Sequence, residues 1–155
     1  MTRSGQGVIT YNSGRFYEGH WLEDKRHGSG YEIFMNGNSY EGEYHQGKVH
    51  GQGKYVWANG EFYEGQWKTG LKSGYGLWKG RDEYIGEWAE NQPNGFGKHS
   101  WSNGDFYEGE WKHCLRHGKG MDSFIIGDIY VGEYSFGKAE GYGQYTWQNG
   151  NHYSG

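Results

Sequence analysis

The pentapeptide YEGEW at residues 107–111 recurs along the chain with little change. Related segments start at Tyr17, Tyr40, Tyr63, Tyr84 and Tyr130, and an incomplete copy starts at Tyr153. Successive copies start 23 residues apart, except for one step of 21 residues. A fixed period of this size indicates an array of small supersecondary units. We therefore expect residues 1–155 to form one continuous array of about six to seven repeats, with the fourth copy shortened to 21 residues and both ends incomplete.

A Gly-x-Gly signal follows each complete copy, eleven residues after its tyrosine, and leads into a short β-prone segment and a turn. The stretch from Gly51 reads GQGKYVWANGEFYEGQW, and Asn-Gly between aromatic runs is a strong β-hairpin signal. No segment has apolar residues spaced i, i+3, i+4, and glycine, with 31 residues, is too frequent for helix interiors. The sequence predicts an all-β fold, namely an elongated, single-layer antiparallel sheet of stacked β-hairpins.

The length of the loop after Trp57 decides which side chains share a face of this sheet. A three-residue loop, with Gly60 in the left-handed region as part of a G1 bulge, pairs Tyr55 with Tyr63. We favour this loop over a two-residue turn because it gathers the aromatic side chains on one face, whereas a slip by one residue would scatter them.

The connection at the other end of each hairpin must have an even length, because the period is odd. A connection over residues 68–71 predicts Gly65 opposite Gly74 and Tyr63 opposite Gly76, where the glycine leaves room for the tyrosine ring. The copy that lacks two residues keeps the same parity, so we expect the aromatic face to continue through it.

All eight tryptophans fall in two positions of the repeat. Four end the YxGxW segment and four end the strand before the turn: Trp21, Trp67, Trp88 and Trp111, then Trp57, Trp78, Trp101 and Trp147. Residues expected on the other face, such as Lys54, Glu64 and Gln66, are mostly polar. The pattern predicts a sheet that is aromatic on one face and solvated on the other.

At these residues the chain resembles the family of MORN repeats (membrane occupation and recognition nexus), whose motif is close to YEGEWxxGxxxGxGxxxxxNGxxY. The resemblance covers roughly residues 5–155 and implies a rod or groove of consecutive β-hairpins. The chain departs from the motif in its shortened copy, in Ile126-Gly127 where Asn-Gly is expected, and in Cys114, where other copies have Gly, Asn or Asp. The Cys114 departure bears only on the geometry of its own turn.

The resemblance implies more about the fold than about function, because MORN arrays accompany lipid kinases, a lysine methyltransferase, junctional membrane proteins, ciliary spoke components and protozoan cytoskeletons. The repeats occupy the whole sequence, so we expect no enzymatic activity. Our leading hypothesis is a non-catalytic scaffold in a cytoskeletal, ciliary or membrane-proximal assembly. It would bind a helix or an extended peptide of a partner protein.

The predicted binding surface is a groove along the aromatic face, because a single layer cannot cover its own apolar side and Tyr and Trp favour binding hot spots. A part of these rings is also expected to pack on one another as the core. The groove residues are Tyr17, Trp21, Tyr40, Tyr44, Trp57, Tyr63, Trp67, Trp78, Tyr84, Trp88, Trp101, Tyr107, Trp111, Tyr130, Tyr134 and Trp147.

A second hypothesis is a lipid-surface or small-ligand module. Basic residues follow five of the six complete YxGxW segments and would form a rim along one edge of the sheet: Lys25, Arg26, Lys48, Lys72, Arg116 and Lys138. A rim of this kind could contact anionic lipid, but lipid-binding patches concentrate basic residues without compensating acids. Here 19 acidic residues outnumber 15 basic ones, so we expect this contact to be weak.

Metal, cofactor and catalytic sites are not expected. His27 and His50 occupy equivalent positions in successive hairpins, about 10 Å apart at the spacing of β-strands, which is too far for shared zinc ligation. We interpret repeated histidine as turn chemistry or as solvent exposure. The paired acids of YEGE, such as Glu108 and Glu110, are expected on a polar face rather than in a cleft that would perturb their pKa.

The remaining features concern partners and location. The net charge of −4 makes nucleic acid a poor partner. The single cysteine fits a reducing compartment, and neither a long apolar run nor a secretory signal is present. We expect a cytoplasmic protein with cytoskeletal or membrane association. Unpaired end strands are templates for pairing, so self-association through them is also predicted.

Overall fold

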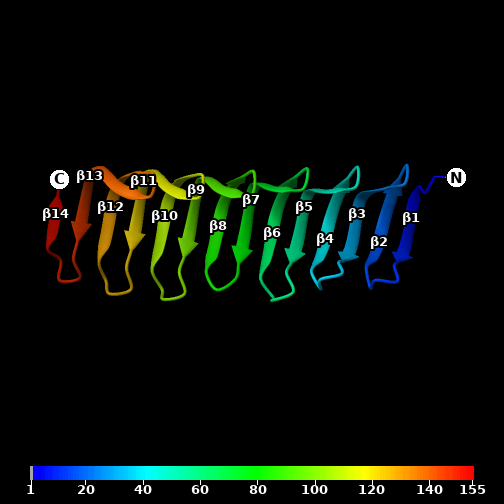
Figure 1. Cartoon of the computed structure of the whole chain (residues 1–155). Helices are drawn as coiled ribbons and strands as arrows, with labels where there is room; N and C mark the ends of the chain where they lie inside the picture. Colours follow the sequence, from blue (N-terminus) through cyan, green and yellow to red (C-terminus); the bar gives the residue numbers. More distant parts are fainter. Residues whose placement is uncertain (1) are drawn as a thin grey trace. The chain divides into compact units, whose positions relative to one another are not determined.

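The computed structural model describes residues 2–155, which form fourteen β-strands and no helix (Figure 1). The strands belong to two compact units, one up to Gly80 and one from Arg81. The first unit contains β1 (Gly5–Thr10), β2 (Phe16–Leu22), β3 (Lys25–Ile33), β4 (Ser39–His45), β5 (Lys48–Val56), β6 (Phe62–Lys68) and β7 (Leu71–Lys79). The second contains β8 (Glu83–Ala89), β9 (Gln92–Ser100), β10 (Phe106–Lys112), β11 (Leu115–Ser123), β12 (Ile129–Ser135), β13 (Lys138–Thr146) and β14 (His152–Ser154).

Within each unit, every strand pairs antiparallel with the next strand in the sequence. Each unit is therefore a single open layer of consecutive hairpins. The predicted all-β class and the stacked antiparallel hairpins are confirmed.

The hairpin turns at the Asn-Gly sites have the predicted three-residue geometry. The Trp57 N–H donates to the Glu61 carbonyl at 2.8 Å, and Gly60 has a φ of 93°. Tyr55 consequently lies opposite Tyr63, as expected. Gly127 has a φ of 100° and makes the same turn after Ile126, because the left-handed glycine, rather than the asparagine, is what the turn requires.

Two-residue turns join the hairpins at their other end. His113 and Cys114 have φ values of 49° and 67°, and Thr69-Gly70 has 49° and 84°, so both are turns with two left-handed residues. Cys114 thus keeps the geometry of the other copies. The second residue of the turn also bonds the preceding repeat: the Gly70 N–H donates to the Val49 carbonyl at 2.9 Å.

The predicted register beside these turns is wrong. Lys68 does pair with Leu71, but Gly65 lies opposite Gly76 rather than Gly74, and Tyr63 lies opposite Trp78 rather than Gly76. The reason is a β-bulge in which Gln66 alone faces residues 73–75. Its two extra residues preserve the parity, so the aromatic side chains remain on the predicted face.

We call this side of each sheet the aromatic face; it carries the first and fifth residues of YxGxW. The other side, the opposite face, is less polar than predicted. It exposes Val8 and Tyr31 in the first unit and Phe96 and Val131 in the second, because β-branched and aromatic residues favour strands on either face. The polar part of the prediction holds at Lys54, which lies 3.9 Å from a carboxylate oxygen of Glu64.

Candidate functional site

The first tyrosine of each motif is the core of its repeat. Tyr40, Tyr63 and Tyr107 have no exposed surface. The ring of Tyr107 meets that of Trp111 edge to face, with centroids 5.0 Å apart, an arrangement that aromatic pairs prefer. The Tyr107 hydroxyl donates to the Glu110 carbonyl at 2.9 Å, which satisfies a backbone oxygen in the bulged segment.

Two glycines leave the space that the Tyr107 ring occupies. Gly109 belongs to the motif itself, and Gly120 lies opposite it in the next strand. A Cβ at either position would overlap the Tyr107 side chain. The same relationship links Tyr17 to Gly30, where a Cβ would lie 2.5 Å from the phenol oxygen. Glycine is therefore required here for close approach of the ring.

The fourth residue of the motif stabilises the bulge. Glu110 Oε2 accepts a hydrogen bond from the Lys119 N–H at 2.6 Å, and Gln66 Oε1 accepts one from the Tyr75 N–H at 2.8 Å. Sequence reasoning placed Glu110 on a polar face and missed this role. The signal was the recurrence of Glu or Gln at this position in five copies, always nine residues before the bonded N–H: Glu43, Gln66, Glu87, Glu110 and Glu133.

The predicted groove residues differ widely in exposure. Ten are buried: Tyr17, Tyr40, Tyr44, Tyr63, Trp67, Tyr84, Trp88, Tyr107, Trp111 and Tyr134. Five are half-buried: Trp21, Trp57, Trp78, Trp101 and Tyr130. Trp147 is 43% exposed. The accessible rings of the aromatic face are therefore mainly the four tryptophans that precede the turns.

Where tyrosine replaces the fifth-position tryptophan, an acid is buried beside it. The Tyr44 hydroxyl donates to Glu32 at 2.9 Å, and Glu32, only 2% exposed, also pairs with Arg26. In the second unit Tyr134 donates to Asp122, which pairs with Arg116 at 3.1 Å. Burial, reinforced by the neighbouring carboxylates, raises the pKa of Tyr44 and of Tyr134, so both phenols stay protonated.

The predicted basic rim divides into two groups. Lys25, Lys48 and Lys138 are exposed next to the two-residue turns. The other three lie over rings of the aromatic face: Arg26 is 5.3 Å from the Tyr44 centroid, Lys72 is 5.2 Å from that of Trp57, and Arg116 is 5.0 Å from that of Trp101. These are cation–π distances.

His99 completes the surface around Trp101. Its ring centroid is 4.6 Å from that of Trp101, and its Nε2 is 3.5 Å from a carboxylate oxygen of Asp82. Burial lowers the pKa of His99; Asp82 opposes this shift, and Arg116 adds to it. The imidazole is therefore held in its neutral form more strongly than an exposed histidine.

Of the two alternatives for the repeated histidines, His27 and His50 follow the first and bond the turns. The Nδ1 atoms of His27 and His50 accept hydrogen bonds from the N–H groups of Gln46 and Thr69, at 3.4 and 3.1 Å. Across residues 2–155 no cluster of three His, Cys, Asp or Glu side chains is arranged to hold a metal ion. The same residues contain no helix long and apolar enough to cross a membrane.

Comparison with known proteins identifies the repeat. The family model of the MORN repeat matches residues 2–14, 17–39, 40–62, 63–82, 84–106, 107–121 and 130–152. Curated protein sequences give no significant match. Among solved structures, the TCP domain of Drosophila melanogaster SAS-4 (dCPAP), in complex with a proline-rich motif of Ana2 (dSTIL), has 11% identity and a TM-score of 0.54, over 97% of this chain and 88% of that chain. The G-box domain of the microcephaly protein CPAP has 9% identity and a TM-score of 0.41, over 97% and 98%. The similarity to the SAS-4 TCP domain is a similarity of fold.

Proposed function

The chain belongs to the MORN repeat family, and from this membership we propose that it is a non-catalytic scaffold that binds a helix or an extended peptide of a partner protein along its aromatic face. The proposal places it in a cytoskeletal, ciliary or membrane-proximal assembly, contexts in which MORN arrays occur. The fold-level similarity to the SAS-4 TCP domain, which was solved with a proline-rich motif, supports an extended peptide as the first ligand to test.

The observation that carries the proposal is the pairing of a half-buried tryptophan with a cation on the aromatic face. Trp57 has Lys72 above its ring in the first unit, and Trp101 has Arg116 in the second. Each tryptophan presents a rigid ring beside a positive charge, a combination that favours binding hot spots. A proline-rich segment is preformed and extended, and it docks on aromatic surfaces at a small entropic cost.

The test uses synthetic peptides in two sets, one proline-rich and one of amphipathic helices, with fluorescence anisotropy as the readout. Trp57→Ala and Trp101→Ala are the variants, made singly because they lie in separate units. Their matched controls are Tyr75→Ala and Phe96→Ala, which remove rings that are 58% and 57% exposed on the opposite face. Thermal melts first establish that all four variants fold.

We expect the tryptophan variants to lose about tenfold or more in affinity for the peptides that bind the wild type, and the controls to change by less than about twofold. An equal loss in both groups, or a loss confined to the controls, contradicts the proposal. Vesicles with and without anionic lipid test the alternative of a lipid surface: binding to anionic vesicles that fades with salt, together with no peptide binding, would favour that alternative.

A further inference from the structure

One row of equivalent positions crosses the aromatic face of the first unit, with one residue in each hairpin. Its members are Arg26 of β3, Val49 of β5 and Lys72 of β7. Each lies directly opposite the fifth residue of the preceding motif, namely Trp21, Tyr44 and Trp67. Over three successive hairpins the row therefore reads cation, apolar residue, cation.

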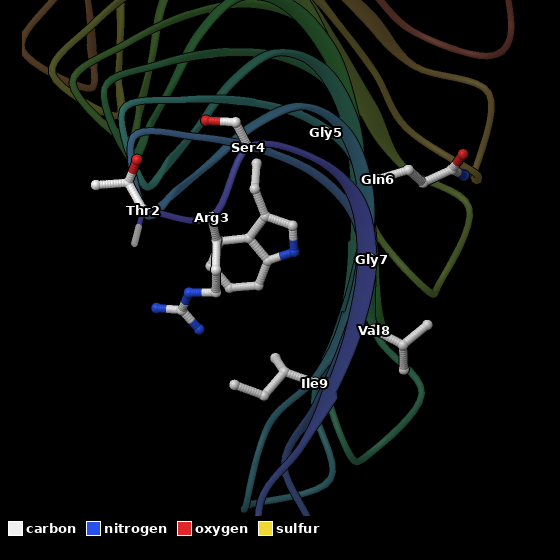
Figure 2. A pocket seen from close by; sticks show the side chains of 9 residues that line it. Thr2, Arg3, Ser4, Gly5, Gln6, Gly7, Val8 and Ile9 are labelled. Atoms are coloured by element: carbon white, nitrogen blue, oxygen red, sulfur yellow. The ribbon is translucent and has the colours of Figure 1, made fainter.

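A further cation lies on this face before β1. The guanidinium of Arg3 is 4.4 Å from the Trp21 centroid, in a pocket lined by residues 2–9 and Trp21. Figure 2 shows Arg3 and Ile9 on one side of β1. Arg3 Nε is also 3.0 Å from a carboxylate oxygen of Asp24. This charge already has its counter-charge within the chain, so Arg26 and Lys72 are the better places for an incoming acid.

The spacing of the row selects the conformation of a ligand that crosses the strands. Neighbouring strands lie about 4.8 Å apart, so equivalent residues of successive hairpins are about 9.6 Å apart. A polyproline II helix rises about 9.3 Å in each turn of three residues, so every third side chain meets the next hairpin. An α-helix repeats its facing side chains after about 10.5 Å, and a β-strand after about 6.7 Å. Polyproline II is the conformation that stays in step with the hairpins.

Strand β5, which lies between the two cation-bearing strands, contributes to a cluster of uncharged rings. The ring centroids of Phe34 and Tyr55 are 5.7 Å apart, and those of Tyr55 and Trp57 are 4.8 Å apart. All three side chains are half-buried. Lys72 Nζ lies 5.2 Å from the Trp57 centroid, so a cation borders the rings. Rings of this kind are the surfaces on which prolines dock.

The charges near Arg26 favour an acidic ligand, although the chain as a whole is acidic. Glu32, which is 2% exposed, pairs with Arg26 and also lies 3.4 Å from Arg15. One buried carboxylate thus offsets only one of two guanidinium groups. Acids of the second motif position, such as Glu64, point to the opposite face because side chains alternate along a strand. The surface around Arg26 therefore keeps a net positive charge.

We propose that the first unit binds an acidic polyproline II segment that crosses β3 to β7, with one turn of the ligand on each hairpin. This ligand rests on the proposed function and specifies its partner. One acid faces Arg26, the other faces Lys72, and a proline between them contacts the rings beside β5. Two turns separate the acids, so they occupy positions i and i+6, with the proline at i+3. Each carboxylate gains a charge-assisted hydrogen bond, and the preformed helix loses little entropy on binding.

The first test compares two labelled peptides of equal composition by fluorescence anisotropy with the whole chain. Both have capped ends: PPEPPPPPEPP has its glutamates six residues apart, and PPPEPPPPEPP has them five apart. Because a turn contains three residues, the second peptide turns one glutamate away from the face by a third of a turn. At low salt we expect the first peptide to bind about threefold or more tightly than the second, and added salt to reduce the difference.

The second test moves a charge within the row. The double variant Val49→Lys with Lys72→Val shifts one cation by a single hairpin, and both substitutions introduce residue types already present in this row. We expect this variant to prefer PPPPEPPEPPP, with glutamates three residues apart, over the peptide that the wild type prefers. Lys54→Val removes a cation from the opposite face and is the matched control, with wild-type preferences expected. Thermal melts establish that the variants fold.

Equal binding of the two isomeric peptides by the wild type, or an unchanged preference in the double variant, overturns the proposed ligand. If proline-rich peptides bind through Trp57 regardless of glutamate spacing, or if only amphipathic helices bind, the scaffold function stands and the acidic polyproline II ligand is wrong. If neither class of peptide binds, both proposals fail.

Discussion

The ring of Tyr107 lies directly on Gly120, one strand away, with no space for a side chain between them. The variant Gly120→Ala must displace this ring from the core, and we expect it to lower the free energy of unfolding by about 3 kcal/mol. Urea denaturation measures the loss. Gly7→Ala is the matched control and should cost less than about 0.5 kcal/mol, because no ring covers Gly7. Equal effects of the two substitutions would contradict this account of the glycines.

The carboxylate of Glu110 should contribute through its hydrogen bond rather than its charge. Because Gln66 makes the same bond in another copy, we expect Glu110→Gln to leave stability nearly unchanged. Glu110→Ala leaves the Lys119 N–H without its acceptor and should cost about 1–2 kcal/mol in urea denaturation. Glu108→Ala, an exposed acid two residues earlier, serves as the control. A loss for Glu110→Gln as large as that for Glu110→Ala would show that charge is what counts.

The first complete copy has His20 at this fourth position, and the structure gives no hydrogen bond between His20 and Ser29, the residue nine positions later. Replacing His20 with glutamate should supply the missing acceptor. We expect His20→Glu to raise the free energy of unfolding by about 1 kcal/mol, and His20→Ala to leave it nearly unchanged. Both are measured by urea denaturation. If His20→Glu does not raise the free energy of unfolding, the stabilising hydrogen bond at the bulge is confined to the other copies.

Buried phenols should make the fold sensitive to alkali. Burial raises the pKa of Tyr107 to about 12, with Asp122 adding to the shift and Arg116 opposing it. Burial also raises the pKa of Tyr40 and Tyr63. Unfolded tyrosine ionises near pH 10, so the unfolded state releases protons first and stability falls as the pH rises above about 10. Urea denaturation at successive pH values should show this decline. Ionisation of all tyrosines in a chain that remains folded would refute it.

We expect His99 to make the free energy of unfolding depend on pH in mild acid. Burial lowers the pKa of this imidazole below the usual 6.5. As the pH falls below about 6.5, the unfolded chain takes up a proton before the folded chain does, and stability decreases until the pKa of the folded state is passed. We expect His99→Phe to flatten the pH dependence of the unfolding free energy in this window. An unchanged slope in the variant would assign the effect to other groups.

The sequence predicted the turn ends of the hairpins because the loop chemistry is local. The left-handed glycine at residue 60 fixes the pairing of Tyr55 with Tyr63 without reference to any other repeat. The prediction of the register beside the two-residue turns was wrong. Parity restricts a register only to even shifts, and a bulge with two extra residues satisfies parity as well as a regular ladder does. Gly74, with a φ of 81°, was the residue that marked the bulge.

The aromatic residues of the candidate site were also predictable, but their exposure was not. Tyr63 and Trp57 belong to one pattern in the sequence, yet the first is fully buried and the second half-buried, because depth depends on which neighbouring strand covers each ring. Likewise, Arg26 and Lys25 are adjacent, and strand alternation turns only Arg26 onto the aromatic face. Predicting such placements requires the correct strand register, and the register predicted from the sequence was partly wrong.

Hydrogen bonds such as that from the Gly70 N–H to the Val49 carbonyl tie two-residue turns to the repeat just before them. Every strand pair within a unit joins neighbours in the sequence. No strand pair in such a unit requires a distant part of the chain. As the polypeptide leaves the ribosome, each newly completed hairpin can settle on the one already formed, so that folding keeps pace with translation.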